Sequence, residues 1–359
     1  MRDAIVFSGW RWEAFNVPER IALALSFLGM KVLYSENPTS LFRHRRCEIR
    51  EVEKEIFCFG PQFLGHRLNS LPLMPDLQAK FLVRQILEQV ERLQLRDPIV
   101  VYPNMGQLLP VCLQLKRKGF PLVFVCLDFP SPILEEHVRI ADKILVIPKA
   151  GFHRLKAKFG DKVYLIPQSV RLPDVDLAFV LNNCRRIPPD LEQIPAPRLG
   201  YLGVPQDRLN LPVLKRLLSS HPDWHFVSFG TEKCVDLPNV HTLAWRTQRE
   251  LPNLIASLDV GFMPYDCSTD MDFFCVPLKT FDYFAAGLPV VATPIVHLWD
   301  YEDLVYFGNT PEELAEAVTN ALEEAADSPK KTKRVAIARE HSIENLSRLL
   351  APLLSEWNG

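Results

Sequence analysis

The sequence predicts an α/β fold built from two domains with parallel sheets. Short apolar runs alternate with amphipathic helical patterns along the whole chain, which is typical of parallel sheets flanked by helices. This alternation restarts near residue 198, after a stretch that holds Pro188, Pro189, Pro195 and Pro197. The length of 359 residues suits two domains better than one.

We place the first domain at residues 1–185 and the second at 198–340, with 186–197 as a stiff proline-rich linker. Apolar runs in the first domain predict strands at 4–7, 31–34, 99–102, 122–126, 143–147 and 163–166, and helices at 18–28 and 76–95. The second domain is expected to contain strands at 198–203, 225–230, 239–243, 260–264 and 289–293, and helices at 212–219, 251–256, 278–286 and 311–325; a further helix is expected at 343–355, after this domain. The lysine-rich stretch 328–334 is expected to be an exposed connection.

Composition indicates a soluble globular protein, with 48% hydrophobic and 23% charged residues. No apolar run is long enough for a membrane span, and the first residues enter a strand pattern without a signal-peptide layout. The eight cysteines form no C-x-x-C pair, which favours buried free thiols over a disulfide or zinc site. We therefore expect a cytoplasmic protein.

Charge is distributed unevenly: residues 1–180 carry a formal charge of +6 and residues 181–359 carry −8. A basic half can face an anionic membrane surface or an acidic acceptor, which predicts peripheral contact with the inner face of the cell membrane. A solvated face without a partner explains the same charges, and the residues leave both interpretations open. No nucleic-acid partner is expected.

Several classes of chemistry lack their motifs. The chain has no G-x-x-x-x-G-K-[ST] phosphate loop, no G-x-G-x-x-G after the first strand, no H-E-x-x-H and no G-x-S-x-G. His221 and His225 have helical metal-ligand spacing, but Pro222 argues against a helix there. Kinases, dehydrogenases, zinc hydrolases and serine hydrolases are therefore disfavoured.

One segment, residues 277–291, reads as a helix, a glycine stop and a strand. A helix that begins near Pro277 presents free amide groups and a partial positive charge, which suit a phosphate. Lys279 on the first turn adds a full charge, and Asp282 one turn later can accept hydrogen bonds from a ribose diol. An ordinary helix–turn–strand unit with a solvated lysine and aspartate has the same pattern, so this segment alone decides nothing.

With its neighbours, the segment resembles the donor-binding helix of GT-B glycosyltransferases in the family 4-like group (glycosyltransferase group 1), of the kind used in bacterial surface polysaccharide or glycolipid assembly. The likeness is carried by Pro277-Leu278-Lys279, Asp282, Ala285-Ala286-Gly287, Pro289-Val290-Val291 and Leu199-Gly200-Tyr201-Leu202-Gly203. It covers residues 198–355 strongly and 1–197 weakly. It implies two Rossmann-like domains that face each other across a cleft, and a C-terminal helix at 341–359 that crosses back to the first domain.

The resemblance also implies roles for residues. In the family the helix start faces the diphosphate, an acidic residue binds the ribose, and a basic residue neutralises the phosphates. Here the implied nucleotide-sugar contacts are Gly203, Arg208, Trp245, Arg246, Thr269, Asp270, Pro277, Leu278, Lys279 and Asp282. The ribose-binding residue is usually Glu, whereas this chain has Asp282. Phe274 stands where many retaining members carry a first Glu. Either Asp266, Asp270 or Asp272 substitutes for it, or the chain belongs to a subgroup without that Glu, or catalysis is lost, and the stereochemistry of transfer stays open.

The first domain supplies the remaining candidates. Asp128 follows an apolar strand at the end where α/β proteins bind ligands, and it is the candidate general base of an inverting enzyme; a turn or helix-cap aspartate is the alternative. Trp10, Arg11 and Trp12 follow the first strand and are candidates for acceptor binding through stacked indoles; a packed loop is the alternative.

The resemblance implies a hexosyltransferase-like glycosyltransferase that transfers a sugar from a nucleotide sugar to a lipid-linked or polysaccharide acceptor. UDP is the nucleotide that the family implies. Helix dipoles and basic residues stabilise the leaving diphosphate in this fold, so neither a metal nor a cofactor is expected. The alternatives are a catalytically inactive nucleotide-sugar or glycan-binding protein and a nucleotide-sugar epimerase of the same fold.

Overall fold

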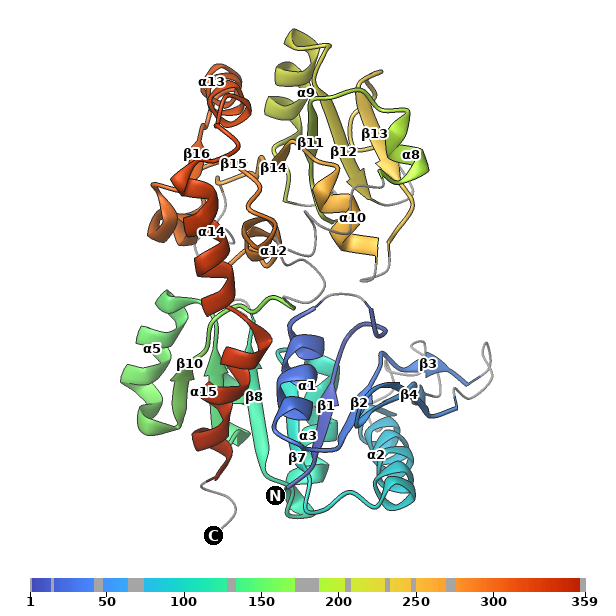
Figure 1. The fold of residues 1–359 in the computed structure, drawn as a ribbon. Helices are drawn as coiled ribbons and strands as arrows, with labels where there is room; N and C mark the ends of the chain where they lie inside the picture. The colour runs from blue at the N-terminus through green and yellow to red at the C-terminus, as the bar shows by residue number, and fades with distance from the viewer. Residues whose placement is uncertain are drawn as a thin grey trace. The chain divides into compact units, whose positions relative to one another are not determined.

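Two large sheets, one in each of two units, organise the described residues in the computed structural model (Figure 1). The first unit comprises Met1–Pro167 and Ile343–Gly359, and the second comprises Gln168–Ser342. The structure describes residues 2–13, 16–41, 48–63, 74–127, 134–171, 187–203, 208–229, 233–246, 250–268 and 276–355. The predicted α/β class with parallel sheets is confirmed.

The sheet of the first unit has, among the described residues, eight strands in the order β10-β9-β8-β7-β1-β2-β5-β4. Its strands are β1 (Ala4–Phe7), β2 (Val32–Ser35), β4 (Arg50–Glu53), β5 (Ile56–Phe59), β7 (Ile99–Pro103), β8 (Leu122–Cys126), β9 (Lys143–Val146) and β10 (Val163–Leu165). All neighbours are parallel except β4 and β5, and a separate ladder pairs β3 (Thr39–Ser40) with β6 (Gln62–Phe63). β1, β7 and β8 are buried throughout, which explains their continuous apolar sequences.

Helices flank this sheet and bring the end of the chain back to it. They are α1 (Val17–Phe27), α2 (Met74–Leu93), α3 (Leu109–Arg117), α4 (Leu134–Ile140), α5 (Lys149–Phe159), α15 (Ile343–Ser355) and the short 3₁₀ helices η2 (Gly106–Leu108) and η3 (Gly160–Lys162). α1 begins where the Asn16 side chain accepts a hydrogen bond from Glu19 N at 3.0 Å. α15 belongs to the first unit and packs against α1, which confirms the predicted return of the C-terminal helix.

The second unit contains a fully parallel sheet, with six strands among its described residues in the order β13-β12-β11-β14-β15-β16. The strands are β11 (Arg198–Gly200), β12 (His225–Phe229), β13 (Val240–Leu243), β14 (Val260–Met263), β15 (Val290–Ala292) and β16 (Val305–Phe307). The helices are α8 (Pro189–Glu192), α9 (Leu211–Ser220), α10 (Leu251–Ala256), α12 (Lys279–Ala285), α13 (Pro311–Leu322), α14 (Pro329–Glu340) and the 3₁₀ helix η5 (Val296–Tyr301). Among the described helices of the whole chain, none has both the length and the apolarity needed to cross a membrane.

Tyr283 fixes α12 onto the centre of this second sheet. Its side chain is fully buried, and its hydroxyl donates to Gly200 O at 2.9 Å and accepts from Leu202 N at 2.8 Å. A β-carbon on Gly261 of β14 would lie 2.6 Å from the Tyr283 ring, so this strand position needs glycine for the helix to pack so closely. The hydroxyl therefore ties α12 to the loop that follows β11.

Residues 186–197 were predicted to be the linker between the two domains, but this proline-rich stretch does not separate the two units. The chain passes between units at Pro167–Gln168 and at Ser342–Ile343 instead. Residues 187–197 belong to the second unit, where Pro189 opens the short helix α8 and Leu191 is fully buried. The prolines thus shape a helical turn that leads into β11, because proline is well tolerated in a first turn.

The prediction of an exposed connection at 328–334 is wrong. Ser328 caps a helix there, α14, by accepting a hydrogen bond from Lys330 N at 3.2 Å. Arg334 is fully buried on this helix and binds Glu324 through two hydrogen bonds of 2.7 and 2.5 Å. The buried side of this helix includes an arginine, a residue type that is usually exposed, so its sequence lacks the regular apolar pattern that predicts a helix.

The two passages between the units are tied together within the second unit. Val170 N donates to His341 O at 2.8 Å, and Val170 and Ser342 form an isolated β-bridge. The His341 imidazole Nδ1 lies 2.8 Å from Gln168 O, and its ring stacks on Phe281 of α12 at 3.9 Å between centroids. Residues 168 and 342, which begin and end this unit, therefore lie side by side.

Candidate functional site

The strongest candidate site lies at the carboxyl edge of the second sheet. All its strands are parallel, so the loops after β11 and β14 emerge at the same edge, which is where open α/β sheets bind ligands. Tyr201 and Gly203 follow β11, Tyr265 follows β14, and Lys279 begins α12. β11 and β14 are direct neighbours, which brings residues from both loops together.

Lys279 is the centre of this cluster. Its ammonium Nζ lies 3.9 Å from the centroid of the Tyr201 ring and donates a hydrogen bond of 3.0 Å to the Tyr265 hydroxyl. Within the part of the chain that the structure describes, no carboxylate forms an ion pair with Lys279. No carboxylate in this part of the chain therefore offsets the positive charge of Lys279 next to the loop, which suits an anionic ligand.

Gly203 lies directly beside this ammonium. Its φ of +150° is a conformation that residues with a side chain rarely adopt. A β-carbon at this position would lie 3.4 Å from Lys279 Nζ and would occupy space next to the ammonium. The glycine thus leaves room for a ligand to approach the backbone and the lysine together.

Arg208 joins the same loop region through its backbone. Its carbonyl accepts a hydrogen bond of 2.8 Å from Asp266 N, and the adjacent Leu209 forms a β-bridge with Tyr265. Hydrogen bonds from the side chain and backbone of Ser268 lower the pKa of Asp266, so this half-buried carboxyl stays ionised in neutral solution. The predicted basic residue is therefore placed next to the loop that holds Tyr265.

The remaining predicted residues of the helix segment lie where the motif suggested. Pro277 is buried, and Leu278 is half-buried and directly precedes α12. Asp282 lies one turn after Lys279 and is 7% exposed. Gln168 holds the residues before this helix, because its side-chain Nε2 donates a hydrogen bond of 2.9 Å to Val276 O. This contact was not visible in the sequence, because the two residues are 108 positions apart.

Trp245 and Arg246 are not brought to the Lys279 cluster. They follow β13, which lies at the edge of the sheet and is separated from β11 by β12. Trp245 is exposed, whereas Arg246 forms ion pairs with Asp190 of α8 and, at 3.6 Å, with Glu250. The guanidinium of Arg246 is therefore already engaged by two carboxylates. Of the other predicted residues, Asp128, Thr269 and Asp270 lie outside the described part of the chain.

The first unit presents its own candidates after β1. Trp10 is 48% exposed and Arg11 is also exposed. Trp12 packs instead, edge to face on Tyr34 with centroids 5.0 Å apart, and its backbone N donates to Glu36 Oε1 at 3.0 Å. The structure thus separates the two indoles into one that is available to a ligand and one that supports the loop.

Glu36 is a residue that sequence reasoning missed. It follows β2 directly, is 4% exposed, and forms an ion pair of 2.7 Å with Arg50. Its oxygen also holds the Trp12 backbone. An acidic residue that directly follows a buried strand was the available signal. Glu36 orders the loop that carries Trp10 and Arg11.

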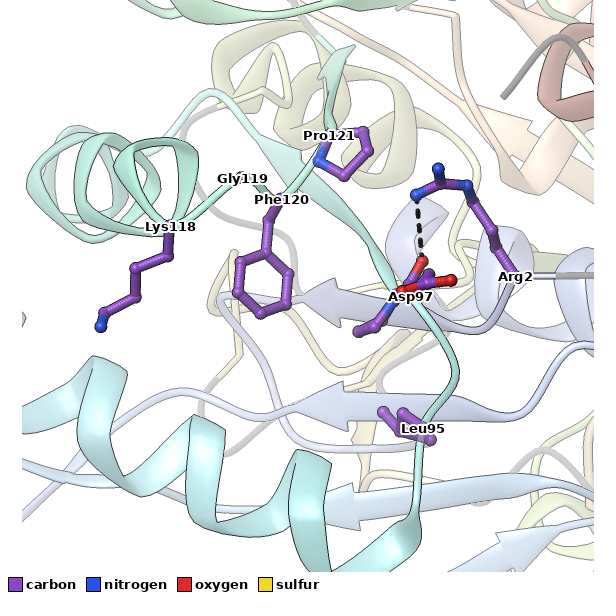
Figure 2. A pocket seen from close by; sticks show the side chains of 8 residues that line it. Arg2, Leu95, Asp97, Lys118, Gly119, Phe120 and Pro121 are labelled. Carbon is purple, nitrogen blue, oxygen red and sulfur yellow. Dashed lines mark hydrogen bonds between the residues drawn. The ribbon is translucent and has the colours of Figure 1, made fainter. Parts of the chain in front are cut away.

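A pocket of about 260 Å³ lies elsewhere in the first unit (Figure 2). Arg2, Asp97, Lys118 and Phe120 are among its lining residues, and Arg2 Nη1 donates to Asp97 O at 3.3 Å. These residues precede β1, β7 and β8, so the pocket is at the amino edge of the sheet. Ligands of open α/β sheets bind at the opposite edge, and we therefore do not assign the function to this pocket.

Sequence comparison links the second unit to a known family. The family described as Glycosyl transferases group 1 matches residues 207–324. A protein of Bacillus subtilis (strain 168), TuaH, whose name proposes a glycosyltransferase of teichuronic acid biosynthesis, is 28% identical over 167 residues. That alignment covers 42% of this chain and spans 41% of the length of the relative.

Solved structures match the whole chain at low sequence identity. The α,α-trehalose 6-phosphate synthase from Burkholderia multivorans has a TM-score of 0.67 and 15% identity, with 100% of this chain and 99% of that one covered. Sucrose-phosphate synthase from Thermosynechococcus elongatus gives 0.69 and 14%, with 99% of both chains covered. A trehalose-6-phosphate structure from E. coli, solved with UDP-2-fluoro glucose, gives 0.67 and 12%, with 98% of both covered. The shared fold is GT-B, as predicted.

Proposed function

Because this chain has the GT-B fold and its residues 207–324 belong to the group 1 glycosyl transferases, we propose that it transfers a sugar from a nucleotide sugar to a glycan or lipid-linked acceptor. UDP is the proposed nucleotide. The similarity to a protein named for teichuronic acid biosynthesis supports an acceptor used in surface-polysaccharide assembly.

The observation that carries the proposal is the placement of Lys279. Its ammonium is held at the carboxyl edge of a parallel sheet, 3.4 Å from where a Gly203 side chain would begin, with no carboxylate partner among the described residues. Transfer of a glycosyl group leaves a nucleoside diphosphate with developing negative charge. A preorganised cation at that point stabilises the transition state more than the ground state.

The other roles follow from this placement. Arg208 provides a second positive charge near the diphosphate, and Asp282 accepts hydrogen bonds from the ribose hydroxyls. The two basic residues together supply the charge stabilisation that a metal supplies in other transferases, so we propose a metal-independent reaction without a further cofactor.

On the acceptor side, the exposed Trp10 ring provides a stacking surface for a sugar or an isoprenoid chain. We propose Arg11 as a contact for acceptor phosphate and Asp128 as the general base that removes the proton from the attacking hydroxyl. The positive charge of residues 1–180 supports an acceptor presented on an anionic membrane surface, at the cytoplasmic side.

The decisive experiment combines binding with turnover. A thermal-shift panel of UDP, GDP and ADP identifies the nucleotide, since a ligand that binds only the folded state raises Tm according to its affinity. With that nucleotide's sugars, Lys279→Ala is expected to lower kcat/KM for transfer or donor hydrolysis about 100-fold or more. Lys215→Ala, which removes an exposed lysine of α9, is the matched control and should behave as wild type.

Three outcomes would contradict the proposal. Wild-type turnover by Lys279→Ala would remove Lys279 from the reaction. Tight nucleotide binding without turnover on any acceptor or water would indicate a catalytically inactive binding protein, and release of an epimerised nucleotide sugar would indicate an epimerase.

A further inference from the structure

The two tyrosines around Lys279 carry an inference that goes beyond the assignment of the lysine. Tyr201 and Tyr265 come from different strand ends and are 2% and 3% exposed. Their rings lie 6.2 Å apart at 70° to each other, and the Lys279 ammonium lies 3.9 Å from one centroid and 5.4 Å from the other. We call this arrangement the tyrosine clamp.

Both tyrosines are fixed by the sheet rather than by the lysine. Tyr201 N donates to Val227 O at 2.8 Å, and its ring stacks on Phe226 with centroids 6.5 Å apart. Tyr265 is held by its β-bridge to Leu209 and donates its backbone N to Met263 O at 3.0 Å. The clamp is therefore in place before any ligand binds.

The chemistry of the clamp matters because lysine is a flexible side chain with four rotatable bonds. A carboxylate partner would order it but would also neutralise it and compete with a phosphate. An aromatic face attracts the ammonium without carrying a negative charge, and a neutral hydroxyl accepts only one of its three N–H donors. The clamp thus orders the lysine and leaves two donors and the full charge for an anion.

We propose that Tyr201 and Tyr265 are positioning residues that hold Lys279 in the orientation required by the diphosphate of the nucleotide. The inference rests on the proposed function, because it assumes that Lys279 meets a nucleoside diphosphate. It adds that affinity for the diphosphate depends on two neutral aromatic residues that act only through the lysine.

The test is a double-mutant cycle measured by calorimetric titration with UDP and with uridine. Tyr201→Leu is expected to weaken UDP binding about 5- to 30-fold, the range of a cation–π contact that is partly desolvated, and to leave uridine binding unchanged. Tyr201→Phe keeps the ring and should bind UDP like wild type. Tyr265→Phe, which removes only the hydroxyl, should weaken UDP binding about 2- to 10-fold.

In the Lys279→Ala background, Tyr201→Leu should cause no further loss of UDP affinity, because the tyrosine acts through the lysine. Phe159→Leu is the matched control, since Phe159 also lies close to lysines, Lys158 at 5.4 Å and Lys162 at 5.5 Å, but belongs to the first unit and not to the Lys279 cluster. It should not change UDP binding.

Three results would overturn the inference. An equal loss in both backgrounds would show that Tyr201 has only a structural role, and unchanged UDP binding by Tyr201→Leu and Tyr265→Phe would show that the lysine needs no clamp. Either result leaves the proposed function standing. If the wild-type chain binds no nucleoside diphosphate, the proposed function fails and the clamp fails with it. Tyr265→Phe decides the question if Tyr201→Leu does not fold.

Discussion

Each unit places a glycine just after its first strand, and the two glycines have different surroundings. A β-carbon on Gly9 of the first unit would lie 2.7 Å from the terminal methyl of Met105, which is the end of a flexible side chain. A β-carbon on Gly203 of the second unit would lie between a fixed tyrosine and an ammonium, on backbone with φ of +150°. The second unit is therefore built as a rigid charged site, whereas the first can adapt.

The same contrast appears in the ion pairs. Arg334 and Glu324 of the second unit are 0% and 6% exposed, and their closest atoms lie 2.5 Å apart. Lys158 and Glu135 of the first unit are separated by the same distance but are 59% and 52% exposed. Distance alone does not show what such a pair contributes, because water screens the exposed one.

The largest expected effect tests this contrast. Arg334→Met leaves Glu324 buried without its cation, which typically costs about 3–5 kcal/mol and should lower Tm by about 10 °C. Lys158→Met should leave Tm unchanged. Scanning calorimetry measures both. If Arg334→Met melts like wild type, burial does not distinguish the pairs; adding Glu324→Gln to Arg334→Met should restore part of the loss.

The next effect compares the two glycines. Gly203→Ala must adopt a disfavoured backbone conformation, which costs about 1–3 kcal/mol, and its methyl group obstructs the approach to Lys279. We expect nucleotide affinity to fall about 10-fold or more and stability to fall as well. Gly9→Ala should cost less, because Met105 can rotate away. Thermal shift with and without UDP measures both variants, and equal effects would contradict the contrast.

The smallest expected effect is a loss of thermal stability at acidic pH. In the second unit His225 Nδ1 lies 3.1 Å from His241 Nε2; burial lowers the pKa of both, and the charge of His225 lowers that of His241 further. In the first unit burial lowers the pKa of His137, which is fully enclosed. Each folded-state pKa lies below the ordinary value of about 6.5, so this stabilisation is present above that pH and is lost as the pH falls through the folded-state pKa.

We expect these histidines to lower Tm by about 1–3 °C between pH 7 and pH 5.5. The variant His225→Gln/His241→Gln should flatten the pH dependence of the second unit, and His137→Phe should remove the share of the first. Calorimetry at constant ionic strength checks both. A double variant with the pH slope of wild type would show that other groups cause the acid sensitivity.

The sequence predicted the central strands well and the margins poorly, for a physical reason. Leu122–Cys126 was predicted at its observed bounds, because a strand buried on both faces must be apolar throughout. Edge strand β4 is polar and half exposed, so nothing in its residues distinguished it from a loop. Helix α14 was missed because its buried side includes Arg334, whose burial depends on a partner ten residues earlier.

Some residues of the candidate site could be predicted from the sequence and others could not. Lys279 and Gly203 were found because short motifs contain them. Tyr201 and Tyr265 were not, although both are aromatic residues next to strand ends. They are 64 residues apart, and only the pairing of β11 with β14 makes them neighbours. Which strands pair in a sheet is decided by packing across the whole unit, which no local pattern contains.

The pairing of Val170 with His341 and Ser342 bears on how the second unit can be exchanged between proteins. A segment whose two ends meet at one point can be inserted into a host protein through a single loop. The second unit satisfies this condition, since Val170, near its start, forms a β-bridge with Ser342 and donates a 2.8 Å hydrogen bond to His341 O, both inside the unit. Exchange of this unit for another therefore has to match two chain junctions that lie next to each other.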